Sequence, residues 1–587
     1  MPGTRVRSHK AEKALERMGQ KVNRQIAGSL LACVHCGMCT DSCHYVLANP
    51  GDPTYAPAYK ADRIRKLFKR HHDWTGRVFP WWVKAGTVWT DDDLEELKDV
   101  VFGKCTNCRR CTLNCPMGVD LATFNRMARG MLVSVGVMPE GVAVVSKDQW
   151  EIGNQMGVLR EDYLETLEWM ADELRDELDD ESVDIPVDQT DRDVIYAINP
   201  REVKYDPRTI ADAAKIFHAA GERWTMASEG WDMTNFGLFS GDDALGGSVA
   251  QRLYEKVTEL RARRLVISEC GHGFRSTRCE GPNWAKVDVP FEMESSIVTM
   301  LRYIREGRIT VDKTRNDRPV TYHDSCNMAR SCGVTEEPRE LLRLVCMDFR
   351  EMHPNRAENY CCTGGGGAMS MSEYTPRRLK SGVVKADQLR ATGAEIVVTS
   401  CHNCVDGLAD VIRHYKLGME VTQLVNLVAN AVVLEKKVVV PVEEVAVAVP
   451  ATEAPELVLA GRKVVVADDE PDQVEYLATV LEDHGAVVWR AADADHALVL
   501  ARREQPDLVT LDLAMPGRDV GEVFEILRRD PTLADLKICV VTGRPELRKL
   551  IYGRSVRPPE GYLDKPVSEA TLVLNVRKIL EVADRET

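Results

Sequence analysis

The chain has 587 residues, 44% of them hydrophobic and 28% charged, so it is expected to form several soluble globular domains rather than one core. Its formal net charge of −15 argues against a general nucleic-acid binder, and no apolar run reaches the ~18 residues needed to span a bilayer. Eighteen cysteines without an apolar export signal predict a cytoplasmic protein whose thiols serve metals or redox chemistry.

The first predicted domain, residues 1–150, is helical and contains two runs of four cysteines with the spacing C-x2-C-x2-C-x3-C. These cysteines are Cys33, Cys36, Cys39 and Cys43 in the first run, and Cys105, Cys108, Cys111 and Cys115 in the second. In this ferredoxin-type spacing, three thiolates surround one cluster and the fourth ligates the other. Two cubane 4Fe-4S clusters are therefore predicted. Zinc is the alternative, but it typically uses separated C-x-x-C pairs. His44 stands where proline usually follows such a run, and it can alter the potential of that cluster.

A basic helical pattern and an aromatic group, residues 59–89, separate the two runs. The aromatic group contains Trp74, Trp81, Trp82 and Trp89. This stretch can rest on an anionic membrane surface or a membrane-embedded partner. The alternative, a solvated helix face with a packed aromatic lid over the clusters, is favoured because basic helices are usually just exposed. At most peripheral membrane association is expected.

The second predicted domain, residues 151–432, begins with an acidic helix and continues as an α/β domain. The segments "RLVISECGHGF" (264–274) and "EIVVTSCHNCV" (395–405) match each other, with a strand leading to Cys270 or Cys401. Three residues further on, the first copy has Gly273 and the second has Cys404. This pattern predicts an internal duplication in which one copy lacks a metal ligand.

The second copy carries the fuller set of cysteines: Cys326, the adjacent pair Cys361 and Cys362, Cys401 and Cys404. Cysteines at strand ends lie on loops that a rigid sheet holds in place. Four glycines, residues 364–367, follow the pair and permit backbone angles that let both thiols turn inward. A phosphate-binding loop is disfavoured because no Lys-Ser/Thr and no GxGxxG occurs there. A vicinal disulfide is disfavoured by the reducing compartment.

This pattern, with "YHDSC" and "CCTGGGG", resembles the cysteine-rich CCG domain of heterodisulfide reductases, and the resemblance covers about residues 25–430. It implies that Cys326, Cys361, Cys362, Cys401 and Cys404 bind a noncubane 4Fe-4S cluster at which disulfides are reduced. Because the first copy keeps only Cys270, the chain looks like single-site relatives, such as the catalytic subunit of the membrane heterodisulfide reductase and its counterpart in sulfate reducers.

The resemblance also implies partners from anaerobic metabolism: a flavoprotein, a cytochrome b-type subunit or heterodisulfide reductase-like subunits, with the chain in the cytoplasm or held by a partner at the inner face of the membrane. Three functions stay open. The chain is an oxidoreductase subunit with thiol–disulfide chemistry at the CCG site, or an electron-transfer subunit between a flavoprotein or quinone system and another redox protein, without its own disulfide substrate. The third is a redox signalling protein whose clusters report to the C-terminal domain.

The remaining candidate residues are more simply explained as structural than as functional. His272, His323 and His402 can tune a cluster or donate a proton, but such histidines are more often loop or core residues. Cys279, Cys332 and Cys346 have no partner spacing and are predicted to be structural, as is Cys539 in an apolar strand.

A proline- and valine-containing linker, residues 433–459, precedes a third predicted domain, residues 460–587. Asp468, Asp469 and Asp512 end predicted strands and suit Mg²⁺, whereas Thr542 and Lys565 suit phosphate oxygens. The segment resembles a doubly wound (βα)5 response-regulator receiver domain. The resemblance implies that Asp512 is the phosphoacceptor, that Thr542 and Tyr562 are switch residues and that Lys565 binds phosphate. A histidine kinase or small phosphodonor is the implied partner, and the absence of a helix-turn-helix indicates that DNA is not the output. The fold class predicted for the whole chain is multidomain α/β.

Overall fold

The computed structural model describes residues 8–83, 85, 89–287, 289–434, 458–515, 518–542, 551, 556–557, 559–565, 567, 569, 572–573, 575–577 and 579–580. The chain divides into two compact units, residues 1–438 and 439–587. The domain boundary predicted at residue 150 stays a prediction. Both ends of the predicted linker 433–459 are structured, because Val433 pairs with Thr310 and Leu459 is buried in the C-terminal core.

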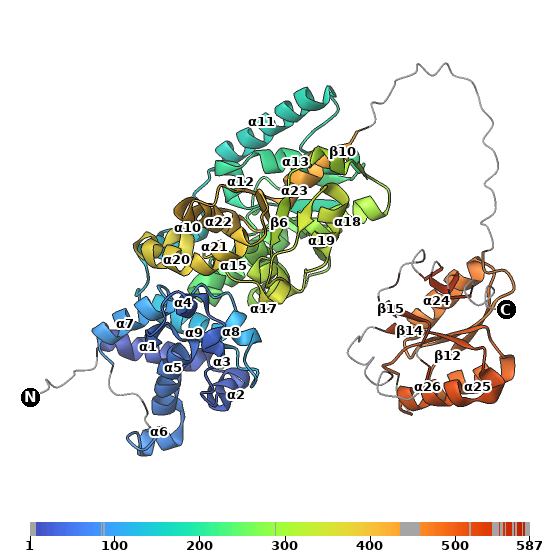
Figure 1. Cartoon of the computed structure of the whole chain (residues 1–587), viewed down its shortest axis with the longest axis horizontal. Helices are drawn as coiled ribbons and strands as arrows, with labels where there is room; N and C mark the ends of the chain where they lie inside the picture. Colours follow the sequence, from blue (N-terminus) through green and yellow to red (C-terminus); the bar gives the residue numbers. More distant parts are fainter. Residues whose placement is uncertain are drawn as a thin grey trace, which may run out of the picture. The chain divides into compact units, whose positions relative to one another are not determined.

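The first part of the N-terminal unit is helical (Figure 1). Its helices are α1 (His9–Lys21), α2 (Arg24–Ala32), α3 (Met38–Asp41), α4 (His44–Leu47), α5 (Pro57–His72), α6 (Trp74–Val78), α7 (Asp91–Val101), α8 (Arg110–Leu113), α9 (Leu121–Val133) and α10 (Glu140–Glu151). Their apolar faces form one core that also takes in Phe236, Phe239 and Ala368. The helical part is therefore packed directly on the α/β part of the same unit.

The α/β part contains two four-stranded parallel sheets with the same strand order. One has the order β2-β1-β3-β4 and consists of β1 (Val194–Ala197), β2 (Trp224–Thr225), β3 (Arg264–Ile267) and β4 (Glu292–Ser295). The other has the order β7-β6-β8-β9 and consists of β6 (Val320–His323), β7 (Phe349–Arg350), β8 (Ile396–Thr399) and β9 (Glu420–Thr422). This correspondence bears out the internal duplication, with β3 and β8 leading to Cys270 and Cys401.

Helices surround these two sheets, and the short antiparallel pair β5 (Thr310–Val311) and β10 (Val432–Val433) closes the unit. The acidic helix predicted at its start is α11 (Arg160–Leu178). The others are α12 (Pro200–Tyr205), α13 (Arg208–Ala219), α14 (Gly237–Ser240), α15 (Asp243–Glu259), α16 (Gly271–Phe274), α17 (Gly281–Ala285), α18 (Ser296–Arg305), α19 (Glu337–Val345), α20 (Thr375–Ser381), α21 (Val383–Arg390), α22 (His402–Tyr415) and α23 (Leu424–Ala431). Two segments, Arg275–Glu280 and Cys326–Arg330, are π-helical.

The C-terminal unit has a five-stranded parallel sheet of order β12-β11-β13-β14-β15. Its strands are β11 (Lys463–Ala467), β12 (Val487–Ala491), β13 (Leu508–Leu511), β14 (Lys537–Thr542) and β15 (Gly561–Asp564). The helices α24 (Pro471–Asp483), α25 (Ala494–Glu504) and α26 (Val520–Arg529) connect the first four strands. Separate apolar cores cover the two faces of the sheet, as expected for a doubly wound fold.

The aromatic segment between the cysteine runs does not form the packed lid that the sequence favours. Trp74, Trp81 and Trp82 are 71%, 78% and 70% exposed, and only Trp89 is buried. They follow α5, whose apolar face is already occupied by Ile64, Leu67 and the rest of the helical core. Across the described residues, no helix combines the length and apolarity needed to cross a membrane.

Candidate functional site

Both ferredoxin-type runs fold into the same turn. The backbone takes positive φ angles at His35 (56°) and Gly37 (83°) in the first run, and at the equivalent Asn107 (52°) and Arg109 (64°) in the second. Short helices, α3 and α8, then begin at the next residue of each run. Two left-handed residues between three cysteines curl the chain so that successive thiols face the same side.

The fourth cysteine of each run lies with the other run. Cys43 lines one cavity together with Cys105, Cys108 and Cys111. Burial raises the pKa of the Cys111 thiol well above its usual value, and the nearby thiolates of Cys108, Cys105 and Cys43 raise it further. This is the crossed arrangement that the C-x2-C-x2-C-x3-C spacing predicts.

In the second group of sulfurs, the fourth cysteine of the second run, Cys115, lies with the cysteines of the first run. Cys39 is buried, and its pKa is raised by that burial and also by Cys33 and Cys115. Cys36, which completes the first run, is exposed. The eight cysteines thus form two sets of thiol donors, which suits iron–sulfur clusters rather than isolated structural thiols.

The five cysteines assigned to the CCG domain gather at the carboxyl ends of β6 and β8. Cys326 begins the π-helical segment after β6, and Cys401 and Cys404 lie at the start of α22 after β8. The thiol of Cys362 is hydrogen-bonded to Cys361 and Cys404, and Cys404 is hydrogen-bonded to Cys401. Cys326 lies close enough to Cys361 and Cys362 for their charges to raise its pKa, after the larger effect of burial.

The four glycines let backbone segments approach that any side chain would keep apart. A Cβ on Gly364 would lie 2.1 Å from the carbonyl oxygen of Asn403, next to Cys404. A Cβ on Gly366 would lie 2.5 Å from the carbonyl oxygen of Thr106, within the second ferredoxin run. The glycine loop therefore serves close packing of the CCG cysteines against the ferredoxin cysteines.

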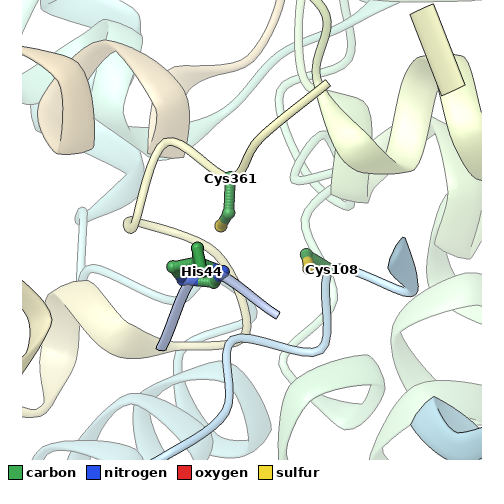
Figure 2. A group of neighbouring side chains, drawn as sticks. All are labelled: His44, Cys108 and Cys361. Atoms are coloured by element: carbon green, nitrogen blue, oxygen red, sulfur yellow. The ribbon is translucent and has the colours of Figure 1, made fainter. Parts of the chain in front are cut away.

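The two cysteine-rich sites touch each other. His44, Cys108 and Cys361 come from three different segments, and one ligand atom of each lies within 4.8 Å of the others (Figure 2). The pKa of Cys108 is raised to about 11, first by its hydrogen bond with Cys361 and then by burial. Among the described residues, the buried Nε2 atom of His44 has no hydrogen-bond partner, which suits a ring that faces a group held between these thiols.

Three arginines hold this junction together. Arg129 is fully buried and donates to the carbonyl oxygens of Cys105 (2.7 Å) and Gly366 (2.6 Å). Arg110 donates to the carbonyl oxygen of Glu358 at 2.8 Å, and Arg330 donates to those of Cys108 and Asn359. Buried backbone oxygens require hydrogen-bond donors, and these arginines supply them. They thereby fix the ferredoxin loop, the CCG loop and the segment of Cys326 relative to one another.

A sixth cysteine, Cys270 of the first repeat, also reaches the CCG site. The ligand atoms of Cys270, His272 and Cys401 lie within 4.8 Å of one another, and the Cys270 thiol is hydrogen-bonded to Cys401. The pseudo-symmetric sheets bring the ends of β3 and β8 together, so the cysteine left in the first copy faces the ligands of the second.

The three histidines have different surroundings. His323 lies within 4.8 Å of the Cys362 and Cys404 sulfurs, and burial lowers its pKa well below the usual value. His272 belongs to the group with Cys270. His402 instead places Nε2 at 3.0 Å from the Glu202 carboxylate. Two of the three therefore face sulfur, and His402 is hydrogen-bonded to a buried carboxylate.

Lys385 is a site residue that the sequence did not indicate. It is buried on α21, and Nζ donates to Asn359 Oδ1 at 2.8 Å. Burial lowers its pKa to about 7, although Cys362 and Cys361 act in the opposite direction. A buried lysine within a helix carries no sequence motif. Only the fold reveals that a positive charge stands beside the thiolates.

In the C-terminal unit, the three carboxylates predicted to bind a metal lie close together. Oxygens of Asp468, Asp469 and Asp512 lie within 4.8 Å of one another, with Asp468 and Asp512 buried and Asp469 exposed. Lys565 Nζ lies 2.5 Å from Asp468 and 2.8 Å from Asp512. Oxygen donors of this kind fit a hard divalent cation. Thr542 is buried at the end of β14, and the side chain of Tyr562 lies outside the described residues.

Three family descriptions match the chain. Residues 29–119 match a 4Fe-4S dicluster domain, residues 320–408 a cysteine-rich domain (CCG), and residues 464–577 a response regulator receiver domain. The dicluster match contains both ferredoxin-type runs, and the CCG match contains all five clustered cysteines.

Relatives that match most of the first unit are named as subunits of redox enzymes. The chain is 27% identical over 459 residues to the Hdr-like menaquinol oxidoreductase iron-sulfur subunit 2 of Archaeoglobus fulgidus, covering 70% of this chain and 81% of the relative. It is 26% identical over 421 residues to a subunit of the dihydromethanophenazine:CoB–CoM heterodisulfide reductase of Methanosarcina mazei, covering 69% and 95%. The C-terminal unit is 30% identical over 118 residues to protein PilH of Pseudomonas aeruginosa, covering 20% and 97%.

Proposed function

Because this chain joins a 4Fe-4S dicluster domain and a CCG domain to residues that belong to the response regulator receiver family, we propose that it carries electrons from two cubane clusters to a CCG-type site of thiol–disulfide chemistry, under receiver control. The observation that carries this proposal is the contact of Cys108 with Cys361. It joins the ferredoxin site to the CCG site without an intervening layer of protein.

The thiol donors divide naturally among three clusters. Cys33, Cys36, Cys39 and Cys115 would hold one cubane, and Cys43, Cys105, Cys108 and Cys111 the other. Cys326, Cys361, Cys362, Cys401 and Cys404 would hold the noncubane cluster. Such clusters supply one-electron transfer, with potentials that hydrogen bonds, charge and solvent exposure adjust.

The chain's own residues provide the conditions for that chemistry. The glycine loop and Arg129 keep the two sites in contact. Lys385 supplies a positive charge beside Cys361 and Cys362, and His323 lies beside Cys362 and Cys404. These groups stabilise negative charge at sulfur in a buried setting where charge is otherwise costly.

The test of ligation is metal analysis of anaerobically purified protein. Three clusters require about twelve irons per chain. We expect Cys361→Ser or Cys362→Ser to lower the iron content to about eight and to remove the spectroscopic signature of the third cluster, while both cubanes survive. Cys332→Ser, which alters a thiol outside the proposed ligands, is the control and should keep the full iron content. About eight irons per chain in the wild type would refute the assignment of a cluster to the CCG site. Zinc in place of iron would refute all three cluster assignments.

A second function is supported by the Archaeoglobus relative, whose name describes a menaquinol oxidoreductase subunit. In this alternative, the chain passes electrons between a flavoprotein, quinone or cytochrome partner and another redox protein and has no disulfide substrate. The exposed Trp74, Trp81 and Trp82 beside the basic α5 suit a membrane-associated partner.

A further inference from the structure

Cys279 and Cys332 are two thiols that the sequence gives no reason to connect. The structure places their sulfurs 3.5 Å apart, although 53 residues separate them in the chain. Cys279 is exposed and Cys332 is half-buried. The sequence predicts two structural cysteines without a partner spacing, whereas in the structure the segments that follow β3 and β6 bring the two sulfurs together.

Both thiols stand on unusual backbone. Cys279 lies inside the π-helical segment Arg275–Glu280, and Cys332 lies two residues after the π-helical segment Cys326–Arg330. Such wide turns are frequent at functional sites. Arg275 links the two segments: its guanidinium is 3.3 Å from Asn327 Oδ1 and 2.8 Å from the Glu280 carboxylate. Arg275 thus holds together the two segments that carry the sulfurs.

The charges around the pair make the two thiols unequal. The pKa of Cys279 is lowered to about 7, chiefly by the hydrogen bond from Cys332 and further by Arg278 and Arg275, while burial and Glu280 oppose this effect. The pKa of Cys332 is raised far above its usual value by the same hydrogen bond and by burial. An exposed thiol with a low pKa is the nucleophile, and its half-buried neighbour is the thiol that resolves a mixed disulfide.

We propose that Cys279 and Cys332 form a second redox site, a surface dithiol that exchanges two electrons with disulfides independently of the cysteines assigned to clusters. The Cys279 thiol first gives its proton to water. The resulting thiolate attacks one sulfur of a disulfide RSSR, which breaks the S–S bond, forms a mixed disulfide and releases RS⁻, and RS⁻ takes up that proton to become RSH. Cys332 then attacks Cys279, forms the Cys279–Cys332 disulfide and releases the second RSH. Two protein thiols are oxidised, one disulfide is reduced, and the two thiol protons leave on the two RSH molecules.

Only a short movement is needed to form the bond. A disulfide has an S–S distance of about 2.05 Å, compared with 3.5 Å between the two sulfurs here. Cys332 also lies six residues after Cys326 in the chain. The dithiol therefore shares a segment with one of the CCG thiols without being one of them.

The experiment uses the full chain with its clusters, under anaerobic conditions, and oxidised glutathione as the probe. Trypsin cleaves after Arg278 and Arg330, so the two cysteines fall in separate peptides, 279–286 and 331–339, each with a single thiol. After quenching with an alkylating agent, the wild type should give these peptides joined by a disulfide. Cys332→Ser should accumulate glutathione on Cys279, and Cys279→Ser should leave Cys332 largely unmodified. Ser331→Ala, which retains both thiols, should behave as the wild type.

A second measurement does not depend on disulfide formation. The pH at which Cys279 is half-maximally alkylated should lie near 7 in the wild type and rise by at least one pH unit in Cys332→Ser, because the hydrogen bond that favours the thiolate is lost. The proposal is overturned if Cys332→Ser collects no glutathione on Cys279, or if the alkylation profile of Cys279 is the same in both proteins.

Discussion

At the CCG site, some residues can be recognised in the sequence and others only in the folded structure. The pair Cys361 and Cys362 and the C-x-x-C of Cys401 and Cys404 are local patterns that the sequence displays, and the resemblance to the CCG domain implied that they act together with Cys326. Lys385 and Cys270 could not be recognised in this way, because their role depends on helices and strands that meet only in the folded protein. The charges around a metal site, and the contacts of the residues that surround its ligands, leave no motif in the sequence.

Lys385 gives the prediction at this scale. Below pH 7, where Lys385 with its pKa of about 7 is charged, Lys385→Met removes a buried positive charge beside Cys361 and Cys362, and reduction of the cluster adds negative charge at the same place. We expect the potential of the third cluster to fall by about 50–100 mV, equivalent to about 1–2 kcal/mol, as measured by redox titration. Lys380→Met removes an exposed lysine from the neighbouring α20 and is the control. An unchanged potential at full iron content would mean that Lys385 only fills space.

At the scale of elements, the strands, the duplication and the receiver fold follow from patterns of apolar residues and strand-end motifs. The junction between the ferredoxin run and the glycine loop does not. The four glycines indicated a close approach, but the approaching segment, Thr106 and its neighbours, lies more than 200 residues earlier in the chain. The exposure of the tryptophans after α5 could not be predicted for a similar reason. It depends on the apolar face of α5 being filled by other parts of the helical core, which the local sequence does not show.

The glycine loop can be tested with two glycines of equal backbone conformation. Gly366 and Gly118 both have φ +65°, but a Cβ meets the Thr106 carbonyl only at Gly366, and nothing lies within 4 Å at Gly118. Gly118→Ala should cost about 1 kcal/mol of stability from strain alone. Gly366→Ala should cost about 2–4 kcal/mol, because overpacking is added, and should slow reduction of the third cluster in stopped-flow experiments. Equal effects of the two variants would contradict a role of close packing at this junction.

At the scale of the whole molecule, the receiver unit can act on the redox unit through a change of charge. The carboxylates and Lys565 are in place for phosphorylation of Asp512, and phosphate would add about −1.5 to −2 charges beside Thr542 and Lys565. Because the redox unit transfers electrons, control by the receiver would show itself as a change in the rate of that transfer.

Incubation with Mg²⁺ and a small phosphodonor is expected to label Asp512 in the wild type. Asp512→Ala should abolish the label, and Asp535→Ala, which alters an exposed carboxylate of the same unit, should retain it. Lys565→Ala should reduce labelling, because Lys565 contacts both Asp468 and Asp512. If the rate of electron transfer is the same with and without label, the receiver does not regulate the redox unit.

The two proposed functions differ in the electron acceptor, and the whole protein can decide between them. Reduced, fully loaded protein is mixed with either a low-molecular-weight disulfide or a menaquinone analogue, and reoxidation of the clusters is followed by absorbance. If the CCG site performs the chemistry, disulfide turnover should disappear in Cys361→Ser and persist in Cys279→Ser, because only the first variant lacks a proposed CCG ligand. Loss of turnover in Cys279→Ser alone would place the reaction at the surface dithiol. Turnover with the quinone analogue and with no disulfide would favour an electron carrier, in which the contact of Cys108 with Cys361 conducts electrons and the glycine loop serves a partner protein rather than a substrate.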